Sequence, residues 1–101
     1  MDLRNVVVAI SGASGSIYGI RVLQMLRQVE DVNSHLVITP SAKSTIGVET
    51  EYSVSEIEEL ADEVHSARDI GASIASGSFK TVGMIVAPCS IKTLSAIANS
   101  F

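Results

Sequence analysis

Three short loops in this chain combine hydroxyl groups with small residues, and each follows an apolar run and leads into a predicted helix. They are Gly12-Ala13-Ser14-Gly15-Ser16, Thr39-Pro40-Ser41 and Pro88-Cys89-Ser90-Ile91-Lys92-Thr93. The free backbone N–H groups and the dipole at a helix N-terminus attract anions, and phosphate is the usual ligand. Lys92 would lie in the first turn of its helix, where the dipole disfavours a cation, so a bound anion would explain its position. The loops therefore predict phosphate binding.

The glycine loop narrows the class of ligand. From Gly12 the sequence reads G-A-S-G-S-I-Y-G, which lacks the G-x-G-x-x-G spacing of dinucleotide-binding loops, and no acidic residue ends the second apolar run to hold a ribose. The Gly-Lys-Ser of a P-loop is also missing. A mononucleotide phosphate is the better prediction. The alternative is a tight strand-to-helix turn whose small residues serve packing only.

Hydrophobic patterning places these loops on an α/β domain. Continuous apolar runs predict three buried strands, at 5–10, 35–39 and 84–87. Helical periodicity predicts helices at 17–29, 41–48, 53–64 and 91–99, and Ser53 with Glu56 forms a capping box. This order of strands and helices indicates a doubly wound parallel sheet, whose ligands bind beyond the carboxyl ends of the strands.

Length, composition and charge exclude several classes of protein. The 101 residues make one domain, 1–101, and 47% of them are hydrophobic, which is typical of a packed globular protein. No apolar run is long enough to cross a membrane, and 7 basic residues against 11 acidic ones disfavour nucleic-acid binding. The single cysteine fits a reducing, cytoplasmic setting. Because doubly wound sheets commonly have about five or six strands, we expect a domain truncated at its C-terminus.

Four further residues invite chemical roles, and for each the simpler interpretation is preferred. Cys89 has no evident histidine base and is predicted to be a buried packing residue. His35 opens a buried strand and is expected to be hydrogen-bonded or at the surface, and His65 follows an acidic stretch and is expected to be exposed. Neither has metal-ligand spacing to another candidate, so no metal site is predicted. Tyr18 is predicted to pack into the core along its helix face.

Several motifs together resemble the flavin prenyltransferases, the UbiX/Pad1-type proteins long described as aromatic acid decarboxylases. The motifs are Ser11-Gly12-Ala13-Ser14-Gly15, Tyr18-Gly19, Glu49-Thr50, Ser76-Gly77-Ser78-Phe79 and Pro88-Cys89-Ser90-Ile91-Lys92-Thr93-Leu94. The resemblance runs in order over essentially the whole chain and covers about the N-terminal half of a family member. It implies a Rossmann-like or flavodoxin-like sheet, of which this chain is the N-terminal part.

The resemblance also implies a reaction and its site. Family members bind FMN and attach a dimethylallyl group from dimethylallyl phosphate to flavin N5 and C6. The product is the cofactor of a UbiD-type decarboxylase, which in many bacteria acts in ubiquinone biosynthesis, and the family assembles into dodecamers. The implied FMN-binding residues are Gly12, Ala13, Ser14, Thr39, Ser90, Ile91, Lys92 and Thr93. Ser14 and Glu49 are the implied catalytic residues, because a hydroxyl and a carboxylate can relay a proton at flavin N5. No metal is implied.

Two departures from the family and two alternative functions accompany this interpretation. Thr39-Pro40 stands where members often have Ser-Lys, so the adjacent cation is lost. The family residues that bind dimethylallyl phosphate lie mostly downstream of position 101, so the chain alone is expected to be inactive. One alternative is an FMN-dependent cysteine-type decarboxylase, which predicts a catalytic histidine on the first helix or just past the second strand. The other is a non-catalytic FMN-binding or assembly module.

Overall fold

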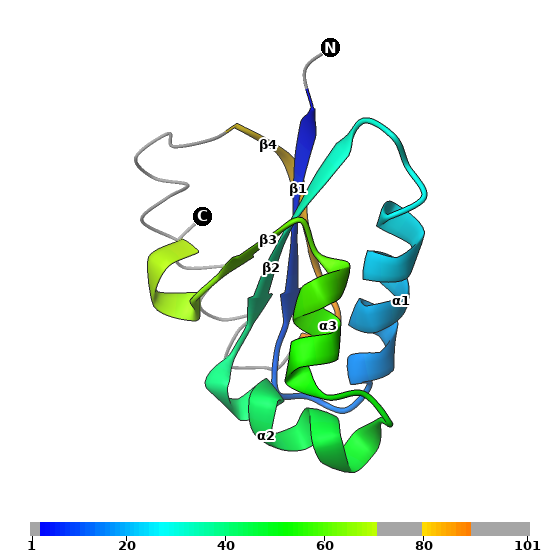
Figure 1. The fold of residues 1–101 in the computed structure, drawn as a ribbon. Helices are drawn as coiled ribbons and strands as arrows, with labels where there is room; N and C mark the ends of the chain where they lie inside the picture. Colours follow the sequence, from blue (N-terminus) through cyan, green and yellow to red (C-terminus); the bar gives the residue numbers. More distant parts are fainter. Residues whose placement is uncertain (1–2, 71–79, 90–101) are drawn as a thin grey trace.

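The computed structural model of the chain describes residues 3–70 and 80–89, and Figure 1 shows their arrangement. Strands and helices alternate through residue 49, and a further helix and two strands follow. The elements are β1 (Arg4–Ile10), α1 (Ser16–Leu26), β2 (Val32–Ile38), α2 (Pro40–Glu49), α3 (Val54–Leu60), β3 (Glu63–His65) and β4 (Thr81–Val86). The predicted helix at 91–99 lies outside the described residues. No helix in the described part of the chain is long and apolar enough to cross a membrane.

The strands form one parallel sheet in the order β3-β2-β1-β4. β1 pairs with β2 along its whole length, from Arg4 opposite Val32 to Ile10 opposite Ile38. On its other side β1 pairs with β4, with an irregularity between Asn5 and Val6. The strand order therefore reverses at β1, which creates the switch point where ligands of doubly wound sheets bind.

The main core lies between the sheet and the three helices. Figure 1 shows α1 and α3 side by side over the same face of the sheet. The fully buried side chains of this core come from β1, β2 and all three helices: Val8, Ile10, Ile20, Leu23, Leu36, Ala42, Ile46 and Ile57. The opposite face carries a smaller apolar cluster of Val7, Val37 and Ile70. Both faces of β1 and β2 are thus covered, as their uninterrupted apolar sequences predict.

The prediction of three strands is wrong by one, because the described sheet has four. The predicted helix at 53–64 begins as expected, with the Ser53–Glu56 capping box, but it ends at Leu60, and Glu63–His65 forms β3. Asp62 explains the change of structure. Its carboxylate accepts hydrogen bonds from the N–H and the hydroxyl of Ser34, and its own N–H donates to Ser34 Oγ at 3.0 Å. These bonds bind the chain to β2 and outweigh the local preference for helix.

The orientation of α1 also differs from the expectation. Tyr18 is 68% exposed, and the buried residues of the helix are Ser16, Gly19, Ile20 and Leu23. Gly19 accounts for this, because a side chain there would collide with the Ala87 carbonyl oxygen and the Ile10 side chain. The helix therefore approaches the sheet along its glycine face, and Tyr18 is turned towards solvent.

Candidate ligand site at the carboxyl edge of the sheet

The described parts of all three hydroxyl loops meet at the carboxyl edge of the sheet, as predicted. The N–H and the hydroxyl of Ser11 both donate to the Pro88 carbonyl oxygen, at 3.3 and 2.6 Å. The Thr39 N–H donates to the Ile10 carbonyl oxygen at 3.0 Å. The loop after β1 is thus joined to the loop after β4 on one side and to the loop after β2 on the other.

Two glycines in the first loop are required by its geometry. A Cβ on Gly12 would lie 2.8 Å from the Ser41 Cβ, so any side chain there would push the first two loops apart. Gly15 has φ 104°, a left-handed conformation that favours glycine, and it is the N-cap of α1. Packing therefore explains part of the glycine content of this loop. It does not explain Ser14, which is exposed between Ala13 and Gly15.

Glu49 is brought to the same loop from the far end of α2. One carboxylate oxygen, Oε2, accepts a hydrogen bond from the Gly15 N–H at 3.2 Å. Glu49 is the last residue of α2, where the helix dipole disfavours a negative charge, so its position is not explained by helix stability. The structure therefore places the two predicted catalytic residues close together, because Gly15 directly follows Ser14.

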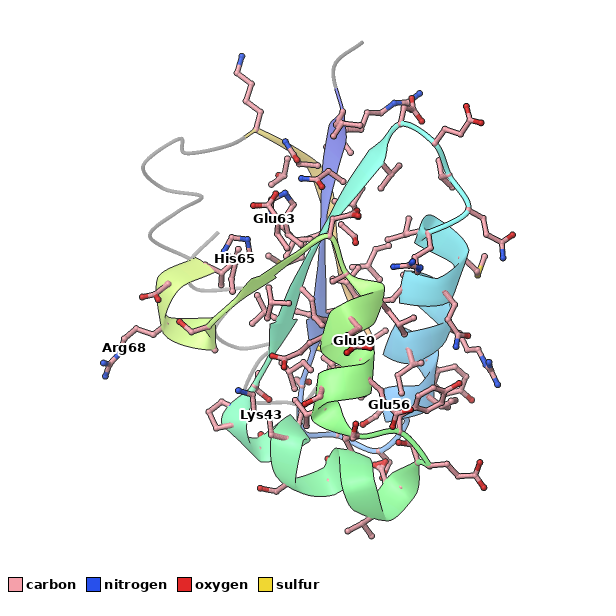
Figure 2. All side chains as sticks on the ribbon, viewed as in Figure 1. Lys43, Glu56, Glu59, Glu63, His65 and Arg68 are labelled. Atoms are coloured by element: carbon pink, nitrogen blue, oxygen red, sulfur yellow. The ribbon has the colours of Figure 1, made fainter. Side chains whose placement is uncertain are left out.

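The beginnings of α1 and α2 both face this edge. Neither helix has an acidic residue in its first turn, although the Glu49 carboxylate accepts a hydrogen bond from the N-cap N–H of α1. Thr39 is the N-cap of α2, and its Oγ1 accepts from the Ala42 N–H at 3.3 Å and lies 3.3 Å from Ser41 Oγ. Lys43 is exposed in the same part of α2 (Figure 2). This arrangement suits an anion held by hydroxyls and backbone N–H groups.

Only some of the remaining predicted site residues lie within the described part of the chain. Gly12 and Ala13 are partly buried at the edge, whereas Ser90, Ile91, Lys92 and Thr93 lie outside the described residues. The prediction that Cys89 is buried is wrong, because its side chain is exposed. Nothing in the predicted motifs marks Ser11 as a residue that joins two loops. Its position directly after a buried strand was the available signal, since a hydroxyl there must find a partner when buried.

Comparison with known proteins identifies the family of the chain. The Flavoprotein family profile matches residues 1–100. The chain belongs to the Flavoprotein family. Among its relatives, flavin prenyltransferase UbiX of Escherichia coli is 54% identical over 99 residues, which are 98% of this chain and 52% of that protein. Flavin prenyltransferase UbiX of Thauera aromatica is 60% identical over 96 residues, which are 95% of this chain and 49% of that protein.

Solved structures of Flavoprotein relatives have the same fold. The structure of AnUbiX in complex with FMN and dimethylallyl pyrophosphate has a TM-score of 0.88 and 48% identity, over 98% of this chain and 52% of that one. A dodecameric FMN-dependent UbiX-like decarboxylase from Escherichia coli has a TM-score of 0.86 and 46% identity, over 94% of this chain and 52% of that one. The α/β, flavodoxin-like fold is thereby confirmed. The chain spans about half the length of the relatives it matches.

Proposed function

We propose that this chain forms the FMN-binding part of a flavin prenyltransferase, which transfers a dimethylallyl group from dimethylallyl phosphate to FMN. The observation that carries the proposal is the joining of three hydroxyl loops at the switch point of the sheet, with Glu49 held against the loop that contains Ser14. The relatives named flavin prenyltransferases, and the solved relative that binds FMN and dimethylallyl pyrophosphate, support the same reaction.

The residues present fit FMN. Gly12 keeps the first loop close to Ser41, and the beginnings of α1 and α2 offer backbone N–H groups, of which the Gly15 N–H at the N-cap of α1 is bonded to Glu49. We assign the FMN contacts to Gly12, Ala13, Ser14, Thr39 and the run Ser90, Ile91, Lys92 and Thr93. Thr39 contributes first as the cap of α2, which fixes the N–H groups of that helix in place.

Ser14 and Glu49 are the proposed proton-transfer groups. When bound, FMN supplies the nucleophilic N5 and C6 atoms to which the dimethylallyl group is attached as its phosphate departs. The Gly15 N–H holds Glu49 Oε2, and a carboxylate so held retains further lone pairs with which to accept a proton. The exposed Ser14 hydroxyl both donates and accepts, so it can pass a proton between the ring nitrogen and Glu49.

The partners of the whole protein follow from the same proposal. Dimethylallyl phosphate would be bound mostly by residues that the longer relatives carry beyond the matched half. A UbiD-type decarboxylase would receive the prenylated flavin, and the dodecameric relative supports a homo-oligomer of the same kind. We propose that the protein acts in the cytoplasm, where its single cysteine, Cys89, would stay reduced.

The cysteine-type decarboxylase is less well supported. It needs a histidine near the flavin, whereas His35 lies three residues before the end of β2 and faces away from α1. His65 lies beside it on β3. Neither is at the carboxyl edge that carries Ser14 and Glu49.

The test uses the complete protein that contains this chain. Ser14→Ala and Glu49→Gln are each expected to lower the rate of FMN prenylation at least roughly a hundredfold while FMN binding is retained. Glu51→Gln, an exposed acid two residues away, is the matched control and is expected to behave as wild type. Unchanged prenylation in both site variants would refute the assignment. FMN binding without prenylation in the unmodified protein would support a non-catalytic module instead.

A further inference from the structure

A second cluster of polar side chains lies away from the carboxyl edge, on the face of the sheet opposite α1 and α3. It contains His35 on β2 with Glu63 and His65 on β3, and Figure 2 shows Glu63 and His65 on that face. His35 is 2% exposed, and the side chain of Glu63 is 52% exposed. The cluster is brought together by strand register, which pairs His35 with Glu63 and Val37 with His65.

The two imidazoles point directly at each other. His35 Nδ1 lies 2.8 Å from His65 Nε2, and the ring centroids are 5.1 Å apart with an interplanar angle of 21°. The separation of the centroids exceeds the separation of the nitrogens by about the sum of the two ring radii. The nitrogens therefore lie near the line that joins the centroids, so the contact is an in-plane N–H···N hydrogen bond and not a stack of ring faces. One proton is shared between the two nitrogens.

The surrounding amides determine which nitrogen of His35 carries the proton and which presents a lone pair. The Asn5 amide group donates to the Lys80 carbonyl oxygen at 2.9 Å, so Asn5 Oδ1 is turned towards His35. That oxygen lies 2.9 Å from His35 Nε2, which must carry a proton to make the bond. His35 Nδ1 then presents its lone pair to His65. Burial lowers the pKa of His35, more than the nearby Glu63 raises it, which favours the same neutral ring.

A hydrogen bond from a neighbouring amide also orients the Glu63 carboxylate. Asn33 Nδ2 donates to Glu63 Oε2 at 2.6 Å and to Asn5 Oδ1 at 3.1 Å. The three residues His35, Glu63 and His65 each offer one ligand atom, and these atoms all lie within 4.8 Å of one another. Glu63 Oε2 lies 3.4 Å from His35 Nε2, so the half-exposed carboxylate has to turn towards Nδ1 to share an ion with it. Histidines that bind metals usually donate their other ring N–H to an oxygen, and ligating carboxylates are themselves hydrogen-bonded. Asn5 and Asn33 supply both of these supports.

We propose that His35, Glu63 and His65 form a binding site for a divalent transition metal of the zinc class. The ion takes the place of the proton between the two rings: that proton moves through solvent to His65 Nδ1, so both imidazoles stay neutral, and His35 Nδ1 and His65 Nε2 each donate a lone pair to the ion. Two imidazoles and a carboxylate are a ligand set that suits zinc, with water as the fourth ligand. Zn–N bonds of about 2.0–2.1 Å in tetrahedral geometry separate two nitrogens by about 3.3 Å.

Binding requires the nitrogens to move apart and one ring to tilt, so that both lone pairs are directed at the same ion. Both changes fall on His65. It is only partly buried and stands at the end of a three-residue strand, whereas His35 is enclosed in the sheet. The bound ion would join β3 to β2 through side chains, in addition to their short ladder of backbone bonds. The site is separate from the proposed flavin site, and its occupation is expected to act on stability rather than on the chemistry at Ser14.

The test is a titration of the chelator-treated chain with Zn²⁺ alone, followed by calorimetry and by thermal unfolding. A Cys89→Ser background removes the single thiol, which is exposed. We expect one zinc per chain and a higher unfolding temperature. Glu63→Gln and His65→Ala are each expected to weaken binding at least roughly tenfold. Glu59→Gln, a change to an exposed acid on α3, is the matched control and is expected to bind as the background does.

Three results would overturn the proposal. The first is that Zn²⁺ shows no saturable binding in the micromolar range. The second is that the Glu63→Gln and Glu59→Gln chains bind Zn²⁺ equally well. The third is that bound Zn²⁺ leaves the unfolding temperature unchanged. Glu63 is half-exposed, so its substitution keeps the test valid even if His65→Ala does not fold. Because the readouts are zinc binding and unfolding, failure here is distinguishable from failure of the flavin assignment.

Discussion

Ser11→Ala tests how the ligand edge is held together. The Ser11 hydroxyl donates to the Pro88 carbonyl oxygen at 2.6 Å, and Ser11 is fully buried. A buried carbonyl that loses its partner costs about 1–3 kcal/mol. The Ser11 N–H still reaches the same oxygen at 3.3 Å, so we expect the lower end, about 1 kcal/mol. For a domain of this size that loss lowers the unfolding temperature by about 4 °C.

The assay is thermal and urea unfolding of Ser11→Ala beside the matched variant Ser14→Ala. Ser14 is exposed, so its substitution is expected to change the free energy of unfolding by less than about 0.5 kcal/mol. In the complete protein, Ser11→Ala is also expected to weaken FMN binding, because the loop that begins at Pro88 then keeps only the weaker bond from the Ser11 N–H to the loop after β1. Equal stability of the two variants would refute the role given to Ser11.

Three further predictions concern stability. Ser16→Ala is expected to stabilise the chain by about 1 kcal/mol in urea unfolding, because Ser16 Oγ is buried and has no hydrogen-bond partner among the described residues; a loss of stability would contradict this. Gly19→Ala is expected to destabilise by about 1–3 kcal/mol in the same assay, because its Cβ would collide with the Ala87 carbonyl oxygen and the Ile10 side chain. In chelator-treated protein, His35 is expected to make stability depend on pH. Burial lowers the folded-state pKa of His35 from the usual 6.5, so its contribution to the free energy of unfolding is complete above pH 6.5 and is lost as the pH falls below that value. The free energy of unfolding of a His35→Asn variant should lack this part of the dependence on pH.

The meeting of the three loops could be predicted from sequence because it depends on one property of parallel sheets. Each apolar run ends directly before its loop, and parallel strands bring their carboxyl ends to one edge. The hydrogen bonds from Ser11 to Pro88 and from Thr39 to Ile10 confirm this. The relation of Glu49 to Ser14 came only from the family resemblance. Nothing in the local pattern distinguishes Glu49 from the other acids of its segment.

The features that were missed depend on contacts between distant residues. β3 has three residues, and the sequence around it is compatible with the end of a helix. Its formation depends on Asp62 bonding to Ser34, 28 positions away. The pairing of His35 with His65 depends in turn on the register of that strand. Spacing along the chain cannot show such a pair, which is why no metal site was predicted.

The most direct test of the central claim compares the binding of FMN and riboflavin to the purified chain by flavin fluorescence. The two ligands differ in the phosphate, so their affinity ratio reports on the phosphate-binding loops alone. We expect FMN to bind at least roughly tenfold more tightly, a difference of about 1.4 kcal/mol, which hydrogen bonds to a charged group and two helix N-termini can supply. Equal affinities would contradict the assignment of these loops as a phosphate site.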